Sequence, residues 1–330
     1  MNFTSDNGRR RRTTRLMRGI GWCVAAILTA HLTSGSAGAQ TLGIASMTPG
    51  SLNHTTATAI ARVLKEKGGI NALVQPTAGE SVIIPLTARG EAELGGANSL
   101  EVSVVVKQQK LDNLRLIGAI HPLPTAFFVR KNTSMRTIGD LKGKKVVYGF
   151  SAQRTIDIVM QAILATSGLT LDDINKVLVP NVVRGADDFV AGAVDTFYFA
   201  FGAPKVREVE ASVGGIRALA VPEAGMAAAR KIFPEGYLAP AVPNQFFIGV
   251  EKPMGVYTWD NLLFTNSKVK DELVYKIIDT LAKHKAELVA IQPALRAFSA
   301  AGLYKKYSVP YHPGALKYFA DHKIEQRATQ

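Results

Sequence analysis

Short apolar runs alternate with segments of helical periodicity along most of this chain, and this alternation limits the folds open to it. Several runs are followed by a helical pattern, and after residue 255 the pattern becomes almost wholly helical, as in 271–288. Strands that alternate with helices form parallel or mixed sheets with helices on both faces, so we predict an α/β fold. The apolar runs lie at 42–45, around 74, and at 92–97, 114–120, 126–130, 145–148, 177–179, 196–199, 218–221 and 246–250.

The length of the chain predicts two lobes. After an N-terminal segment of 39 residues, about 290 remain, which is too many for one small α/β unit. Extended stretches at 121–130 and 238–248 are the expected crossings between lobes. We predict that lobe 1 is discontinuous (residues 40–125 and 238–330) and that lobe 2 is inserted (residues 126–237). A ligand would lie in the cleft, where strand ends and helix N-termini of both lobes converge.

The N-terminal segment predicts the compartment. Six arginines between 9 and 18 precede an apolar stretch, Ile20 to Leu32, and the small residues Ala37-Gly38-Ala39. This order is typical of a secretory signal peptide, so we expect cleavage after Ala39 and a periplasmic protein. The stretch is short for a membrane span, although an uncleaved anchor is the alternative. The residues after Arg11-Arg12 fit a twin-arginine signal poorly, which favours general secretion.

Composition excludes several classes of function. The only cysteine, Cys23, lies in the signal, so the mature chain would have no disulfide and no cysteine nucleophile. The histidines show no metal-ligand spacing, and no catalytic triad or phosphate loop is present. We expect that the protein binds no metal and no cofactor and that it is not an enzyme. Loss of residues 1–39 lowers the net charge from +13 to +8, and the remaining positive charge favours anionic ligands. The basic residues are dispersed, which argues against nucleic acid as a partner.

The stretch 41–60 contains the first candidate site. An apolar run, Leu42 to Ala45, breaks into a Ser/Thr/Pro/Gly turn, and helical periodicity begins around Thr56. The free N–H groups and the dipole of a helix N-terminus both favour an anion. Ser51 and Asn53 would either donate to a ligand there or cap the helix.

Further candidates begin later helices. Arg154 opens a helix after a strand, where its guanidinium could clamp a carboxylate bidentately or simply face solvent; Arg184 is a weaker candidate. Phe199 and Phe201 would wall the pocket or pack in a core. The predicted ligand-binding residues are Ser51, Asn53, His54, Gly79, Ser81, Asn98, Ser99, Arg154, Thr155, Phe199 and Phe201.

Several motifs together resemble one family. They are the turn TPGS at 48–51, TAGES at 77–81, GEAELG at 90–95, IGDLKGKKV at 138–146, FAFGAP at 199–204 and VPYHPGALKYF at 309–319. The combination resembles the TAXI-type solute-binding proteins of tripartite ATP-independent periplasmic (TRAP) transporters. The resemblance covers roughly residues 41–320. The chain departs from the family pattern at 53–54, 98–100 and 150–155, which are predicted ligand loops.

The resemblance implies a type II periplasmic-binding-protein fold whose two lobes close about a hinge around one small solute. It implies that the solute is a carboxylate or an amino acid such as glutamate. It also implies a partner, a sodium-coupled TRAP permease in the membrane. Two alternatives remain: a periplasmic sensor that presents its closed state to a membrane receptor, and an enzyme built on the same fold.

Overall fold

A computed structural model describes residues 41–329 of the chain, so the predicted secretion signal and its cleavage site lie outside the described residues. The strands are β1 (Leu42–Ser46), β2 (Ala72–Pro76), β3 (Leu94–Asn98), β4 (Leu114–Arg130), β5 (Lys145–Tyr148), β6 (Asn175–Leu178), β7 (Phe197–Ala200), β8 (Ile216–Ala218), β9 (Tyr237–Ala241) and β10 (Met254–Asn266). The α-helices are α1 (Leu52–Gly68), α2 (Glu80–Arg89), α3 (Ser99–Gln109), α4 (Ile156–Ala165), α5 (Val182–Val190), α6 (Pro204–Val213), α7 (Met226–Ile232), α8 (Asp271–Lys283), α9 (Lys285–Ile291), α10 (Ala300–Leu303) and α11 (Pro313–Asp321).

The first strand–turn–helix unit forms for local reasons. β1 is buried along its whole length and pairs in parallel with β2 and β3. The Ser51 hydroxyl then caps α1 by accepting a hydrogen bond from the His54 amide (3.1 Å), and Gly69, with φ of 60°, ends the helix in the left-handed conformation. The sequence predicts this strand, turn and helix start correctly.

Two long strands organise the larger sheet. Within residues 41–329 that sheet has eight strands, six of them in the order β2-β1-β3-β10-β4-β7, with β8 beside β4 and β9 beside β10. The pairs of β1 with β2 and β3 are parallel, whereas β10 is antiparallel to β3, β4 and β9. The predicted α/β fold with mixed sheets is therefore confirmed.

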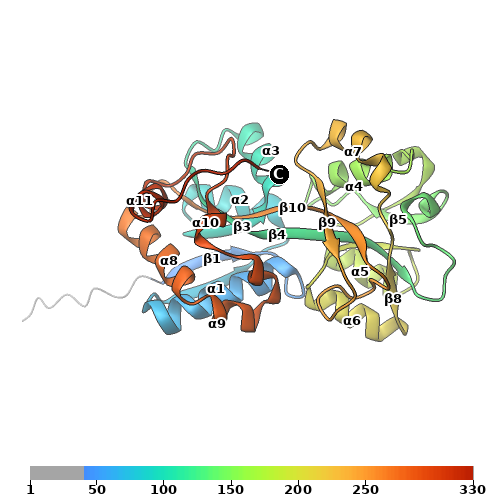
Figure 1. The fold of residues 1–330 in the computed structure, drawn as a ribbon, viewed down its shortest axis with the longest axis horizontal. Helices are drawn as coiled ribbons and strands as arrows, with labels where there is room; N and C mark the ends of the chain where they lie inside the picture. Colours follow the sequence, from blue (N-terminus) through green and yellow to red (C-terminus); the bar gives the residue numbers. More distant parts are fainter. Residues whose placement is uncertain (1–40, 330) are drawn as a thin grey trace, which may run out of the picture. The chain divides into compact units, whose positions relative to one another are not determined.

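The elements fall into two lobes joined by β4 and β10 (Figure 1). Lobe 1 contains β1–β3, α1–α3 and α8–α11, and lobe 2 contains β5–β8 and α4–α7. In lobe 2, β5 and β6 form a two-stranded parallel sheet. The expected crossing near 121–130 falls within β4, and the chain returns to lobe 1 along β10; the exact lobe boundaries at 125 and 237 stay predictions.

Three sequence-based assignments differ from the structure. Residues 114–120 and 126–130 belong to one strand, because Pro122 and Pro124 sit within the pairing with β10. Residues 246–250 are not a strand, since the Asn244 side chain accepts hydrogen bonds from two following amides and folds a turn. The chain after 255 is not wholly helical: β10 is buried on both faces and so lacks the alternation of a surface strand.

The core is continuous through both lobes. In lobe 2 it is aromatic, with the rings of Phe128 and Phe197 stacked 5.1 Å apart and Phe201 set edge-on to Phe128. Between residues 41 and 329, every helix is too short or too polar to cross a membrane.

A matched pair of substitutions on α2 tests the packing of lobe 1. Ile83 is fully buried, whereas its neighbour Val82 is 41% exposed. Replacing Ile83 by alanine removes buried methyl groups and leaves a cavity, so we expect it to lower the free energy of unfolding by roughly 2–5 kcal/mol. Val82→Ala should change it by no more than about 0.5 kcal/mol. Urea unfolding followed by circular dichroism measures both, and equal effects would contradict the assigned helix face.

Candidate functional site

A cavity lies between the two lobes and takes side chains from both of them. The volume open to the centres of water-sized spheres is about 40 Å³. Most of its lining side chains are buried, so it is shielded from bulk solvent. The lining residues are Met47, Ser51, Leu52, Asn53, Glu80, Asn98, Leu123, Thr125, Gln153, Ile156, Val182, Tyr198, Phe199, Ala200, Trp259 and Asn261.

Five helices begin at this cavity. Three start in lobe 1 and two in lobe 2, because in both lobes strands end at the cleft and helices begin there. Helix N-termini carry free N–H groups and a partial positive charge, so their convergence creates a positive potential without any basic side chain. The residues that line the cavity at these helix starts are Ser51–Asn53 for α1, Glu80 for α2, Asn98 for α3, Ile156 for α4 and Val182 for α5.

The start of α1 offers unused hydrogen-bond donors. The backbone amides of Leu52 and Asn53 donate to no acceptor within residues 41–329, although the next amide is capped by Ser51. The Asn53 side chain is already engaged, because its oxygen accepts from the Met47 amide (2.9 Å) and its nitrogen donates to the Gly96 carbonyl (2.7 Å). Asn53 therefore contributes a braced backbone rather than a free side chain.

Glu80 is a buried carboxyl group on the cavity wall. Its side chain accepts hydrogen bonds from both the amide (3.1 Å) and the side chain of Asn98. Burial raises the pKa of Glu80 to about 8, and the nearby negative charge of Glu101 adds to the increase, against the opposing hydrogen bonds from Asn98 and Gln153. Glu80 is therefore largely protonated at neutral pH when the cavity holds no cation.

A second buried carboxylate, Glu101, ties the lobes together. It lies in the first turn of α3 in lobe 1 and accepts from both the amide (2.8 Å) and the hydroxyl (2.5 Å) of Thr155, which precedes α4 in lobe 2. The hydroxyl of Ser81 donates to the same carboxylate. Glu101 thus links the starts of three helices across the cleft.

Backbone contacts reinforce this closure. The Ser81 amide donates to the Ala152 carbonyl (3.1 Å), and the Asn181 side chain donates to the Ala78 carbonyl (3.2 Å). At the turn that precedes α1, the Lys205 amide of lobe 2 donates to the Gly50 carbonyl of lobe 1 (3.1 Å). The lobes therefore contact each other on more than one side of the cavity.

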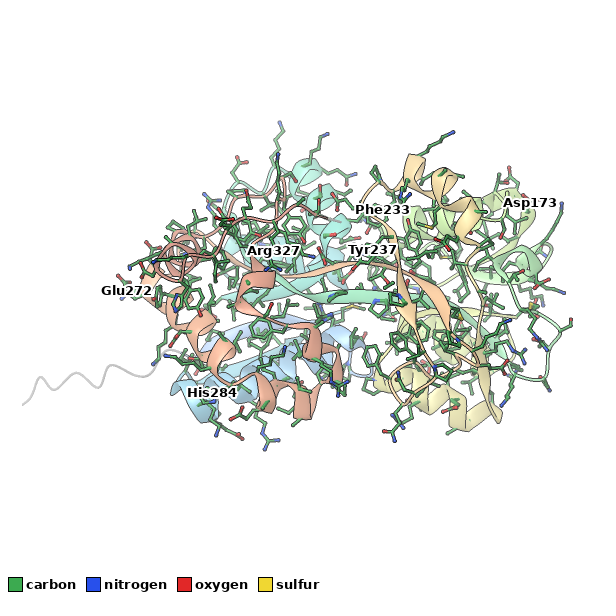
Figure 2. The ribbon with its side chains drawn as sticks, viewed as in Figure 1. Asp173, Phe233, Tyr237, Glu272, His284 and Arg327 are labelled. Carbon is green, nitrogen blue, oxygen red and sulfur yellow. The ribbon has the colours of Figure 1, made fainter. Side chains whose placement is uncertain are left out.

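An aromatic wall comes from the crossing strand β10. The indole N–H of Trp259 donates to the Asn98 side-chain oxygen (3.2 Å), which also caps α3. Phe233 packs edge-on against Trp259 with ring centres 6.0 Å apart, and Figure 2 labels Phe233 and Tyr237 near this strand. Trp259 is thereby held by a polar and an apolar neighbour at once.

The basic residues near the cleft are used elsewhere. The Arg154 side chain is exposed and does not line the cavity, although its backbone amide donates to the Ser81 hydroxyl (3.3 Å). Arg184 is exposed and pairs with Asp188 at 2.9 Å. Lys205 is buried between Asp187 and Glu208. Glu80 is the only charged side chain among the lining residues that the structure describes.

The predicted ligand-binding residues divide into two groups. Ser51, Asn53, Asn98 and Phe199 line the cavity. The other seven do not line it. Ser81 and Thr155 bind Glu101, and Gly79 packs against the Ala152 carbonyl. His54 contacts the Ser46 hydroxyl (3.0 Å), Ser99 contacts Glu235, Arg154 is exposed to solvent, and Phe201 packs in the lobe 2 core. Contact of any of them with a ligand stays a prediction.

Sequence reasoning missed several lining residues. Glu80 is not among the predicted ligand-binding residues, because its burial depends on packing that the sequence does not display. Trp259 and Asn261 are not among them either, because the sequence pattern after residue 255 predicts helices where the structure has β10. A tryptophan beside an Asp-Asn pair within a run of apolar residues is the signal that could have indicated them. In the part of the chain from 41 to 329, no group of three His, Cys, Asp or Glu side chains is placed to hold a metal ion.

A model of the NMT1-like family matches residues 44–322. The chain belongs to this family. Membership of this family agrees with the prediction from sequence that the chain is not an enzyme. The TAXI subfamily is a finer assignment that this match leaves open.

Solved structures share the two-lobed fold of this NMT1-like protein. PhnD1 from Prochlorococcus marinus (MIT 9301), in complex with methylphosphonate, has a TM-score of 0.55 at 10% identity and covers 87% of this chain and 100% of its own. A protein from Bordetella bronchiseptica RB50 has a TM-score of 0.50 at 15% identity, covering 86% and 98%. The alkanesulfonate-binding protein SsuA from Xanthomonas axonopodis pv. citri, bound to MOPS, has a TM-score of 0.49 at 15% identity, covering 85% and 83%.

Gly79→Ala tests the closure of the lobes. A Cβ at position 79 would lie 2.2 Å from the Ala152 carbonyl oxygen of the opposite lobe, so the contact must widen at a cost of about 1–3 kcal/mol. Spin labels at Lys107→Cys and Arg230→Cys, one exposed position on each lobe, report the separation. We expect Gly79→Ala to reduce the fraction of molecules in which the two spin labels are close together. Gly139→Ala, where a Cβ meets only ordinary contacts, should leave it unchanged; an unchanged distribution in Gly79→Ala contradicts this closure.

The ionisation of Glu80 predicts a pH dependence of stability. Its pKa is about 8 in the folded chain and near its ordinary 4.5 when unfolded, so the folded state binds more protons between these values. The contribution of Glu80 to stability is complete below about pH 4.5 and is lost as pH rises through 8, by at most about 5 kcal/mol. Urea unfolding from pH 5 to 9 should show this loss in wild type and not in Glu80→Gln. The exposed-site control Glu223→Gln should keep the wild-type slope.

Proposed function

We propose that this protein is an extracytoplasmic solute-binding protein that captures a small carboxylate or amino acid between its lobes and delivers it to a TRAP-type permease. The observation that carries the proposal is the convergence of five helix N-termini on one cavity between the lobes. Such termini bind anions through backbone N–H groups and need no basic side chain. The unused amides of Leu52 and Asn53 are the best placed donors.

The contacts across the cleft support capture by closure. Thr155, Ala152 and Asn181 of lobe 2 bind groups of lobe 1 around the cavity, so these bonds break when the lobes open to admit or release a solute. A solute that bridges the lobes stabilises the closed form by its difference in affinity for the two forms. The closed form then presents surfaces of both lobes together to a membrane partner.

The choice of a TRAP permease rests on the sequence motifs, in particular YHPGALKYF at 311–319 with GEAELG at 90–95. The arginine-rich start followed by an apolar stretch supports export. Retention of permease subunits, rather than of a membrane receptor, by the solute-loaded protein distinguishes transport from sensing.

Ser51→Ala tests the anion site, with Ser299→Ala as a matched control. Both serines cap a helix with a hydrogen bond of 3.1 Å, to α1 and to α10 respectively, but only Ser51 lines the cavity. Each substitution should cost about 0.5–2 kcal/mol of stability. Calorimetry with a panel of small carboxylates and amino acids should show weaker binding, by about tenfold, for Ser51→Ala alone. If no member of the panel binds the wild-type protein, the proposed function is wrong.

A further inference from the structure

We propose that Glu80 binds the ammonium group of the solute, so that the cavity selects α-amino acids with apolar side chains over simple carboxylates. The inference rests on the proposed function and specifies its class of solute. It follows from three features of the cavity: its balance of charge, the two ends of its polar lining, and its apolar walls.

The balance of charge disfavours a solute that is only an anion. Two carboxyl groups, Glu80 and Glu101, are buried within the ring of helix N-termini, and no lysine or arginine lines the cavity in the described chain. A simple carboxylate would add a further negative charge near that of Glu101 in a region of low dielectric constant, where like charges repel strongly. A zwitterion brings its own compensating charge, because its ammonium group can lie beside a carboxylate.

The polar lining has two chemically different ends. At the start of α1, the amides of Leu52 and Asn53 are free to donate, as a solute carboxylate requires. Glu80 offers the complementary acceptor. A carboxylate has about four lone-pair sites, and the two bonds from Asn98 with the contact to Gln153 leave capacity for one more donor.

The remaining lining is mostly apolar. Because Glu80 is the only acidic or basic side chain of the lining in the described part of the chain, the cavity holds no charged partner for a second carboxylate or a second amine. A dicarboxylic amino acid such as glutamate would therefore bury an uncompensated charge. The apolar walls match a branched aliphatic or aromatic side chain in chemical character; they include Met47, Leu52, Leu123, Ile156, Phe199 and Trp259.

Ionisation of Glu80 gives the inference its own signature. Burial and the negative charge of Glu101 raise the pKa of Glu80 to about 8, so the Glu80 carboxyl group is mainly protonated at pH 7 before a solute binds. Among the groups around it, Glu101 on α3 opposes ionisation, Tyr198 on β7 is neutral because burial raises its pKa, and no basic side chain shares the cavity lining. An ammonium group favours the carboxylate form, so its arrival should expel a proton.

Calorimetry with paired probes tests the inference. Each apolar amino acid is compared with the same molecule lacking its amino group: valine with 3-methylbutanoate, leucine with 4-methylpentanoate, and phenylalanine with 3-phenylpropanoate. We expect at least one amino acid to bind about 10- to 100-fold more tightly than its partner, the range of a hydrogen bond to a charged group. Titrations at pH 7 in two buffers of different ionisation enthalpy should show release of most of one proton with the amino acid.

Variants locate the effect at Glu80. Glu80→Gln should reduce the affinity for the amino acid to about that for its deaminated partner and abolish proton release, whereas Glu223→Gln, exposed on lobe 2, should behave as wild type. Glu80→Asp keeps a carboxylate, and partial retention of the preference there supports the assignment. If Glu80→Gln does not fold, the wild-type probe pairs and proton release still decide.

The failures of the two proposals are distinguishable. Binding of a deaminated acid as tightly as its amino acid, without proton release, overturns the role of Glu80 and leaves the proposed function standing. Glutamate binding more tightly than every apolar amino acid overturns the inferred selectivity. Absence of binding by all acids and amino acids overturns both proposals.

Discussion

The antiparallel pairing of β4 with β10 is the constraint on which the rest of this structure depends. These strands carry the chain between the lobes, and their partners run from Tyr257 opposite Thr125 to Asn266 opposite Leu114. The pairing places residues from both strands at the cavity, among them Leu123, Thr125 and Trp259. It also lets each lobe fold on its own end of a shared sheet, so that helices of both lobes begin at one cleft.

Buried polar groups then fix how the two ends meet. Helix N-termini facing each other across a cleft would repel, because each carries a partial positive charge. Glu101 removes that repulsion where α2, α3 and α4 approach, by accepting bonds from Ser81 and Thr155. The start of α1 lacks such a protein carboxylate within the described chain and keeps its free amides for a solute.

Local signals explain what the sequence predicts well. β1, the turn and α1 depend on an apolar run, a serine cap and Gly69, which are all visible in one stretch. The start of α3 at Asn98 is similarly local. The helical prediction for the region of β10 is wrong because this strand depends on distant contacts. β10 is recognisable as a strand only once its neighbours β3 and β4 are in place.

The same distinction applies to the site. Arg154 and Glu80 both lie at helix starts in the sequence, yet one side chain is exposed and the other almost fully buried. Only the packing of lobe 2 against lobe 1 decides which of them reaches the cavity, and single-residue patterns carry no information on it. The sequence therefore predicts the loops around the cleft better than the individual side chains that enter it.

Asn98 has a consequence for how such a protein can diverge. One side chain caps α3, holds the Trp259 indole and binds Glu80, so any replacement disturbs the helix, the hinge strand and the cavity together. The side chains of Leu123 and Val182 contribute only apolar surface to the cavity, so their replacement breaks none of these hydrogen bonds. A new solute preference is therefore expected to evolve through changes in the apolar lining residues, while Asn98 and its hydrogen-bond partners change only together.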